Sequence, residues 1–117
     1  MKKQIVVVED NPSIREMIEY ILEDHQIEVI SFATAGDFRD AMADISPDLY
    51  LLDIMLPDGN GTDLCRELKA EPASRETPVI MMSAHFGQGQ IECGAEDFIE
   101  KPFDIDDLIS RIQHQIA

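Results

Sequence analysis

Four predicted strands of this chain end at side chains that could do ionic or acid–base chemistry. These side chains are Glu9 and Asp10 after the first strand, Asp53 at the end of another, and then Ser83 and Lys101. A carboxylate, a hydroxyl and an ammonium group that converge on one point can support phosphoryl transfer. The carboxylate can act as nucleophile and form an acyl phosphate, while the hydroxyl and the cation stabilise charge on the phosphoryl oxygens.

The three acids also indicate a metal site. Glu9, Asp10 and Asp53 would repel one another in a shared pocket, and that repulsion raises their pKa values unless a cation is present. Oxygen ligands suit a hard dication, and Mg²⁺ commonly binds a few carboxylates and keeps several waters. We therefore expect Mg²⁺ or Mn²⁺ as the cofactor. Each residue also has an ordinary explanation, because acids often begin helices, serine often forms turns and lysine is usually a surface charge.

The elements that must position these side chains alternate along the chain. Continuous apolar runs predict buried parallel strands, and segments with apolar residues at i, i+3, i+4 and i+7 predict helices between them. The predicted strands are 4–8, 28–32, 49–53, 78–82 and 97–100, and the predicted helices are 12–24, 35–45, 61–70 and one that begins after 104. The stretch 55–60 reads as a loop. The segment 86–93 contains two glycines, so we expect any helix there to be short or irregular.

Strict alternation of strands and helices predicts an α/β fold, a doubly wound three-layer sandwich of the flavodoxin type. One common strand order for five strands is 2-1-3-4-5, whose switch point lies between the first and third strands. Ligands bind at such a switch point, outside the carboxyl ends of the strands. That order brings Asp53 next to Glu9 and Asp10, and the strand 28–32 becomes an edge strand.

Composition limits the classes of function. With 117 residues, the chain is expected to form a single domain over 1–117, without an output domain. The formal charge of −15 argues against direct binding of nucleic acid or anionic membranes. Cys65 and Cys93 lack the spacing of a metal or redox motif, which favours reduced thiols in a cytoplasmic protein.

The sequence resembles a known family, the receiver domains of two-component response regulators. The matching pieces are VVVEDNP at 6–12, LLDIMLPDGNG at 51–61, PVIMMSA at 78–84 and GAEDFIEKPF at 94–103. The resemblance implies that Asp53 is the phosphoacceptor and that Ser83 and Lys101 contact the phosphoryl group. It also implies a metal held by Asp10, Asp53 and the backbone carbonyl of Met55, with Glu9 acting through water.

The same resemblance implies how the domain signals. A histidine kinase or a histidine phosphotransfer protein would phosphorylate Asp53, and Ser83 and Phe98 would switch the face made by the segment 86–93, the strand 97–100 and the last helix. Lys101-Pro102 would be a cis peptide, and Met55 and His85 would tune the phosphate lifetime. A plain surface loop residue is an equal alternative for His85. No enzyme activity is implied beyond self-phosphorylation from small donors and slow autodephosphorylation. We expect a monomer or weak dimer.

Three alternatives compete with this interpretation. A phosphatase of the haloacid dehalogenase type needs an acid two residues after its nucleophile, where this chain has Met55, and it usually needs a cap domain. A flavodoxin-type carrier needs a phosphate-binding loop after the first strand, where Glu9 and Asp10 would repel a phosphate. The third alternative is a protein-docking module with a receiver fold that works without phosphorylation. The interval between Ser83 and Lys101 is shorter than expected for the family by about one helical turn of ~3.6 residues, which keeps this alternative open.

Overall fold

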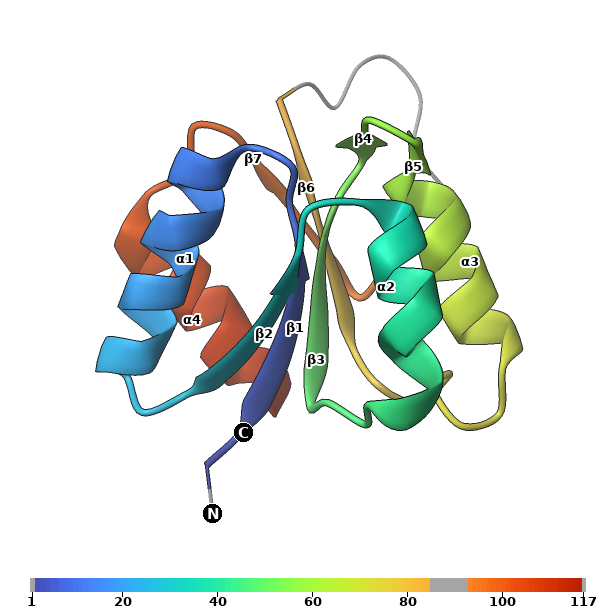
Figure 1. Ribbon diagram of the computed structural model, residues 1–117. Helices are drawn as coiled ribbons and strands as arrows, with labels where there is room; N and C mark the ends of the chain where they lie inside the picture. Colours follow the sequence, from blue (N-terminus) through green and yellow to red (C-terminus); the bar gives the residue numbers. More distant parts are fainter. Residues whose placement is uncertain (1, 85–92, 117) are drawn as a thin grey trace.

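The protein is a three-layer α/β sandwich around one parallel sheet (Figure 1). The structure is a computed structural model that describes residues 2–84 and 93–116. The sheet consists of β1 (Gln4–Val8), β2 (Glu28–Phe32), β3 (Leu49–Asp53), β6 (Val79–Ser83) and β7 (Asp97–Glu100). Its strand order is β2-β1-β3-β6-β7, which confirms the predicted 2-1-3-4-5 order, with β2 at one edge.

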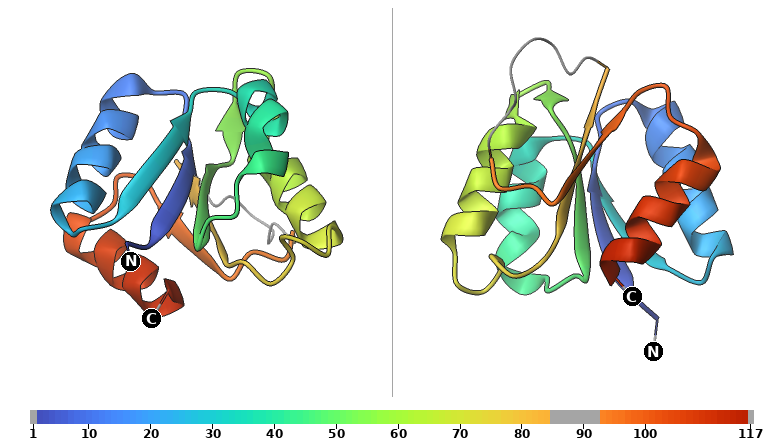
Figure 2. Two further views of the ribbon diagram at one scale, coloured as in Figure 1. Left: turned by 60° about the horizontal axis from the view of Figure 1, so that its bottom comes forward. Right: turned by 180° about the vertical axis from the view of Figure 1, so that it is seen from behind.

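Within residues 2–84 and 93–116, two helices cover each face of the sheet. Helices α1 (Pro12–Asp24) and α4 (Ile105–Ile116) lie on one face, and α2 (Ala35–Ala41) and α3 (Gly61–Ala70) lie on the other, as the opposite views in Figures 1 and 2 show. The alternating residues of each strand face these two layers. Ile5 and Val7 of β1 therefore pack in the core beneath α1 and α4, while Val6 and Val8 pack beneath α2 and α3.

Local side-chain contacts cap the N-terminal ends of three of the helices. The Asn11 side chain accepts hydrogen bonds from the amides of Ser13 and Ile14 at the start of α1. Thr34 accepts from the Asp37 amide at the start of α2, and Asp104 caps α4. Such caps satisfy amides that have no partner inside the helix.

Three details differ from the sequence-based prediction. The fourth strand of the sheet, β6, begins at Val79 instead of Pro78, because proline has no N–H for the hydrogen-bond ladder. At its other end, β6 extends one residue further than predicted, to Ser83. Helix α2 ends at Ala41, and a 3₁₀ turn, η1 (Met42–Asp44), follows it. The expected loop 55–60 contains a small antiparallel hairpin of β4 (Met55–Leu56) and β5 (Gly59–Asn60). The expected irregular helix falls on residues outside the described ranges, as does His85.

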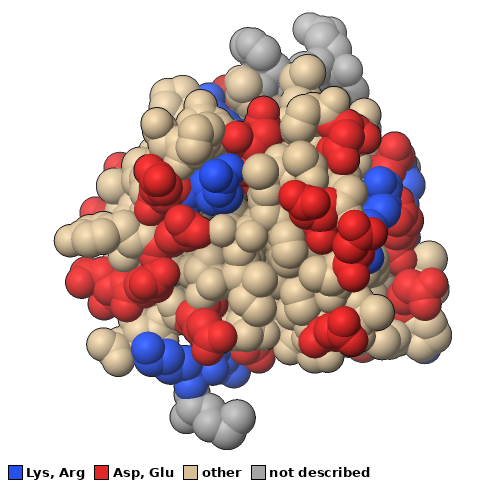
Figure 3. Space-filling model, viewed as in Figure 1, with Lys and Arg blue, Asp and Glu red and all other residues tan. Residues whose placement is uncertain are grey.

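Charged side chains cover the helices. Figure 3 shows acidic groups dispersed over the helices on both sides of this view, without a broad basic patch. In residues 2–84 and 93–116, no helix is both long and apolar enough to cross a membrane.

Candidate functional site

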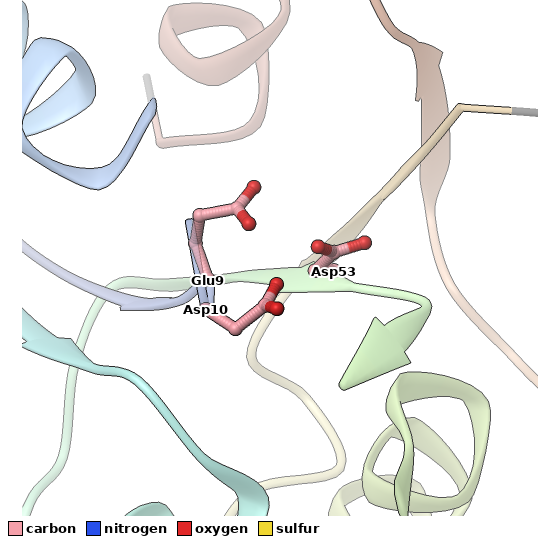
Figure 4. Close-up of side chains that lie close together, drawn as sticks. All are labelled: Glu9, Asp10 and Asp53. Carbon is pink, nitrogen blue, oxygen red and sulfur yellow. The ribbon is translucent and has the colours of Figure 1, made fainter. Parts of the chain in front are cut away.

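The three predicted acids meet at the carboxyl edge of the sheet. Strands β1 and β3 are direct neighbours, with Val8 paired to Leu52, so the residues that follow them come together. Glu9, Asp10 and Asp53 each offer a carboxylate oxygen, and these atoms lie within 4.8 Å of one another. Figure 4 shows the three side chains pointing toward a common space. Glu9 is fully buried and Asp53 is buried, whereas Asp10 is exposed and leaves the site open to solvent.

Lys101 supplies a positive charge to this cluster. Its Nζ lies 2.5 Å from Oε1 of Glu9 and 3.1 Å from Oδ2 of Asp53. Burial alone would lower the pKa of Lys101, but its hydrogen bonds and its attraction to the two acids outweigh burial and raise that pKa. The lysine therefore carries a full charge at the site near neutral pH. Its bond to Glu9, between residues 92 positions apart, could not be read from the sequence.

Glu9 is the acid whose ionisation the site perturbs most clearly. Burial raises the pKa of its carboxyl from 4.5 to about 7, against the opposing hydrogen bonds from Lys101 and the Asn11 amide. The neighbouring Asp53 contributes a smaller part of the same increase. The Glu9 side chain is therefore partly protonated near neutral pH, and a bound dication would favour its ionised form.

Arg15 of α1 holds the turn that carries the first two acids. Its guanidinium donates a 2.9 Å hydrogen bond to the backbone carbonyl of Glu9 and a long 3.5 Å contact to that of Asp10. The Asn11 amide donates to the Glu9 carboxylate. This role of Arg15 was not predicted, because an arginine in the first turns of an amphipathic helix usually only marks its solvent-facing side.

Gly61 allows the approach of α3 to the end of β3. A Cβ atom at this position would lie 1.9 Å from the backbone carbonyl oxygen of Asp53, far inside van der Waals contact. The Gly61 amide donates a 2.7 Å hydrogen bond to the carbonyl of Ile54. The absence of a side chain at Gly61 therefore permits the close approach of α3 to the backbone of Asp53.

The remaining predicted residues lie around this edge. Ser83 is buried as the last residue of β6, one register position beyond Met82, which pairs with Asp53. Phe98 of β7 is half-buried and packs against the core beneath α2 and α3. Met55 is 76% exposed, and its amide donates to Oδ1 of Asp53 over 3.3 Å. The Lys101-Pro102 peptide is cis, as predicted.

The chemistry of these donors fits a divalent metal. Within the described ranges, the side-chain ligands at this edge are carboxylates, and the hard oxygen donors of carboxylates suit Mg²⁺ or Mn²⁺. The excess of negative charge over the single lysine also favours a dication. The site therefore brings together a buried carboxylate, an acid group with donors that suit a divalent metal, and an ammonium.

Comparisons with known proteins agree with this geometry. A family model described as the response regulator receiver domain matches residues 5–113. The phosphate regulon transcriptional regulatory protein PhoB of Escherichia coli is 38% identical over 120 residues, which cover 97% of this chain and 51% of that protein. The chain thus spans about half the length of the curated relatives it matches.

Two solved structures show the same fold. The signal receiver domain of a signal transduction histidine kinase from Syntrophus aciditrophicus is 30% identical, with a TM-score of 0.91 over 97% of this chain and 89% of that one. The receiver domain of sensor histidine kinase PA1611 from Pseudomonas aeruginosa is 28% identical, with a TM-score of 0.91 over 99% of this chain and 98% of that one. That structure is described with a magnesium ion in its active site cleft.

Proposed function

The chain belongs to the response regulator receiver domain family, and on this premise we propose that Asp53 is its phosphoacceptor. One observation carries the proposal: the Asp53 carboxylate lies between two other acids and a lysine at the switch point of the sheet. A buried strand-end acid in contact with a fixed ammonium is poised to attack an electrophilic phosphorus. The domain would therefore act in signalling by carrying an acyl phosphate.

In the transfer step, a carboxylate oxygen of Asp53 forms a bond to phosphorus as the bond from phosphorus to the donor breaks. Asp10, Asp53 and the Met55 carbonyl would hold Mg²⁺, with Glu9 acting through water, and the metal would neutralise charge on the phosphoryl oxygens. Lys101 would move its contact from the carboxylates to a phosphoryl oxygen. The Ser83 hydroxyl would donate a hydrogen bond to another, because it ends the strand next to β3.

Phosphorylation would act as a two-state switch. Movement of Ser83 toward the phosphate would free space for Phe98, which is already half-buried, to turn inward. The affected surface would include β7 and α4. Met55 would influence access of water to the acyl phosphate, because it is exposed beside Asp53.

The donor proposed for Asp53 is a phosphohistidine on a histidine kinase or a histidine phosphotransfer protein. The downstream partner would be a protein, because a charge of −15 repels nucleic acid and anionic membranes. We propose a cytoplasmic monomer or weak dimer, active only in self-phosphorylation from small donors and in slow autodephosphorylation. The docking module without phosphorylation is disfavoured, since such a module has no need of a complete site.

Incubation with acetyl phosphate tests this function. Intact mass spectrometry should show one added phosphoryl group on the wild type with Mg²⁺ and much less after chelation with EDTA. Asp53→Asn should stay unmodified. Asp48→Asn is a matched control, because Asp48 lies at the opposite end of β3, where it accepts a hydrogen bond from the Gln4 amide. Equal phosphate on wild type and Asp53→Asn would refute the assignment.

A further inference from the structure

Asp58 joins the turn after Asp53 to the start of α2. Its Oδ1 accepts a 2.9 Å hydrogen bond from the Ala35 amide, and its Oδ2 accepts a 2.9 Å bond from the Gly36 amide. These hydrogen bonds, from Gly36 first and then from Ala35, lower the pKa of the Asp58 carboxyl. Both carboxylate oxygens of Asp58 therefore accept hydrogen bonds from amides 22 and 23 residues away in the sequence. The amides in the first turn of a helix have no acceptor within that helix, so Asp58 supplies one.

Close packing accompanies this contact. A Cβ on Gly36 would lie 3.1 Å from Oδ2 of Asp58, so the missing side chain allows the carboxylate to approach. On the hairpin side, Leu56 is buried in the core beneath α2 and α3. The tip of the β4–β5 hairpin is thus fixed to α2 by hydrogen bonds, and the adjoining Leu56 is held in the core that α2 and α3 cover.

The other end of the hairpin lies at the phosphorylation site. Met55 directly follows Ile54, and its amide donates to Asp53. In β4, Met55 pairs with Asn60, and Leu56 pairs with Gly59. Two-residue strands have little stability of their own. The direction of the Met55 backbone carbonyl therefore depends on contacts that hold the whole hairpin.

We propose that Asp58 is a positioning residue for the metal site: by fixing the hairpin to α2, it holds the Met55 carbonyl toward Asp10 and Asp53. This inference rests on the proposed function, in which that carbonyl is a metal ligand. A side-chain ligand can adjust by changing its rotamer, but a carbonyl ligand moves only with the chain. Loss of the hydrogen bonds between Asp58 and α2 would therefore weaken metal binding without removing a metal ligand. Metal binding would in turn tighten the contact between Asp58 and α2.

The first test measures Mg²⁺ affinity by amide chemical shifts in a titration of the full chain. Asp58→Ala should raise the dissociation constant roughly tenfold, the lower range for residues that orient metal ligands. Asp58→Asn should give a smaller increase, because its amide keeps one acceptor oxygen. Asp63→Ala is the matched control: it removes the same charge from the first turn of α3, where Asp63 pairs with Arg66.

Two further readouts separate positioning from general destabilisation. In phosphorylation by acetyl phosphate, Asp58→Ala should require more Mg²⁺ for half-maximal rate and reach the wild-type rate at saturation. In the wild type, Mg²⁺ should slow hydrogen exchange at the amides of Ala35 and Gly36. Equal Mg²⁺ affinity of Asp58→Ala and Asp63→Ala would overturn this inference while the proposed function stands. A wild type that binds no Mg²⁺ would overturn both.

Discussion

Glu9 shows how one side chain connects stability with the site. It is fully buried beside Lys101 and Asp53, and its carboxyl has a pKa of about 7 in the folded protein, against 4.5 for an ordinary glutamate. The folded chain therefore binds more protons than the unfolded chain between these pH values. Stability contributed by Glu9 is present below about pH 4.5 and is lost as pH rises toward 7.

Replacement of Glu9 by glutamine should remove this dependence. In metal-free buffer, the free energy of unfolding of the wild type should fall by on the order of 2 kcal/mol relative to that of Glu9→Gln as pH rises from 4.5 to 7.5. Urea unfolding at several pH values measures the difference. Glu16→Gln, on the exposed face of α1, is the control and should follow the wild type. Parallel pH profiles for wild type and Glu9→Gln would contradict the assignment.

Asp10 should link metal binding to stability. Mg²⁺ at about 100 times its dissociation constant stabilises a protein by about 2.7 kcal/mol when it binds only the folded state. We expect Mg²⁺ to increase the stability of the wild type by this amount and EDTA to reverse the increase. Asp10→Asn should show almost no stabilisation by Mg²⁺. Thermal unfolding with and without Mg²⁺ measures it. Asp37→Asn, which changes an exposed acid in α2, should retain the response. A full Mg²⁺ response in Asp10→Asn would exclude Asp10 as a ligand.

At the scale of elements, Gly61 controls the junction between β3 and α3. A methyl group there would overlap the Asp53 carbonyl oxygen at 1.9 Å, so Gly61→Ala must displace one of the two elements. We expect a loss of about 3 kcal/mol or more in the free energy of unfolding. The control is Gly59→Ala, whose Cβ would lie 3.8 Å from the Ala35 Cβ, an ordinary contact. It should change stability by only about 0.5 kcal/mol. Denaturant unfolding of both variants tests the difference, and equal stabilities would refute it.

The sequence predicted most elements because its local signals agree with its fold. The run Leu49–Leu52 is apolar throughout, as a strand covered on both faces must be, and Asn11 and Thr34 cap their helices through local contacts. The β4–β5 hairpin was missed because two-residue strands leave no periodic pattern. The contacts of Asp58 with α2 and of Lys101 with Glu9 were missed because they join distant residues. Such contacts are set by packing of whole elements, which a linear pattern does not encode.

At the scale of the molecule, two apolar cores stabilise opposite faces of the sheet, and both cysteines lie in the core beneath α2 and α3. Burial first, and then the neighbouring Cys93, raise the pKa of the Cys65 thiol to about 12. Because the thiolate is the reactive form, a folded chain should protect this group.

We expect iodoacetamide at pH 8 to modify Cys65 very slowly in the native protein and rapidly in urea. Quenched samples analysed by mass spectrometry give both rates, and Cys93→Ala isolates the Cys65 reaction. The native rate should rise with urea in parallel with global unfolding, since exposure of Cys65 requires separation of α3 from the sheet. Rapid native modification would mean that this core opens locally.

The most direct test of the central claim is the chemical location of the phosphoryl group. After treatment with acetyl phosphate and Mg²⁺, borohydride reduction converts an aspartyl phosphate to homoserine, and peptide mass spectrometry locates the change. We predict homoserine at position 53 of the wild type and none in the sample treated without Mg²⁺. Homoserine at another acid, or its absence under all conditions, would contradict the assignment of Asp53 as the phosphoacceptor.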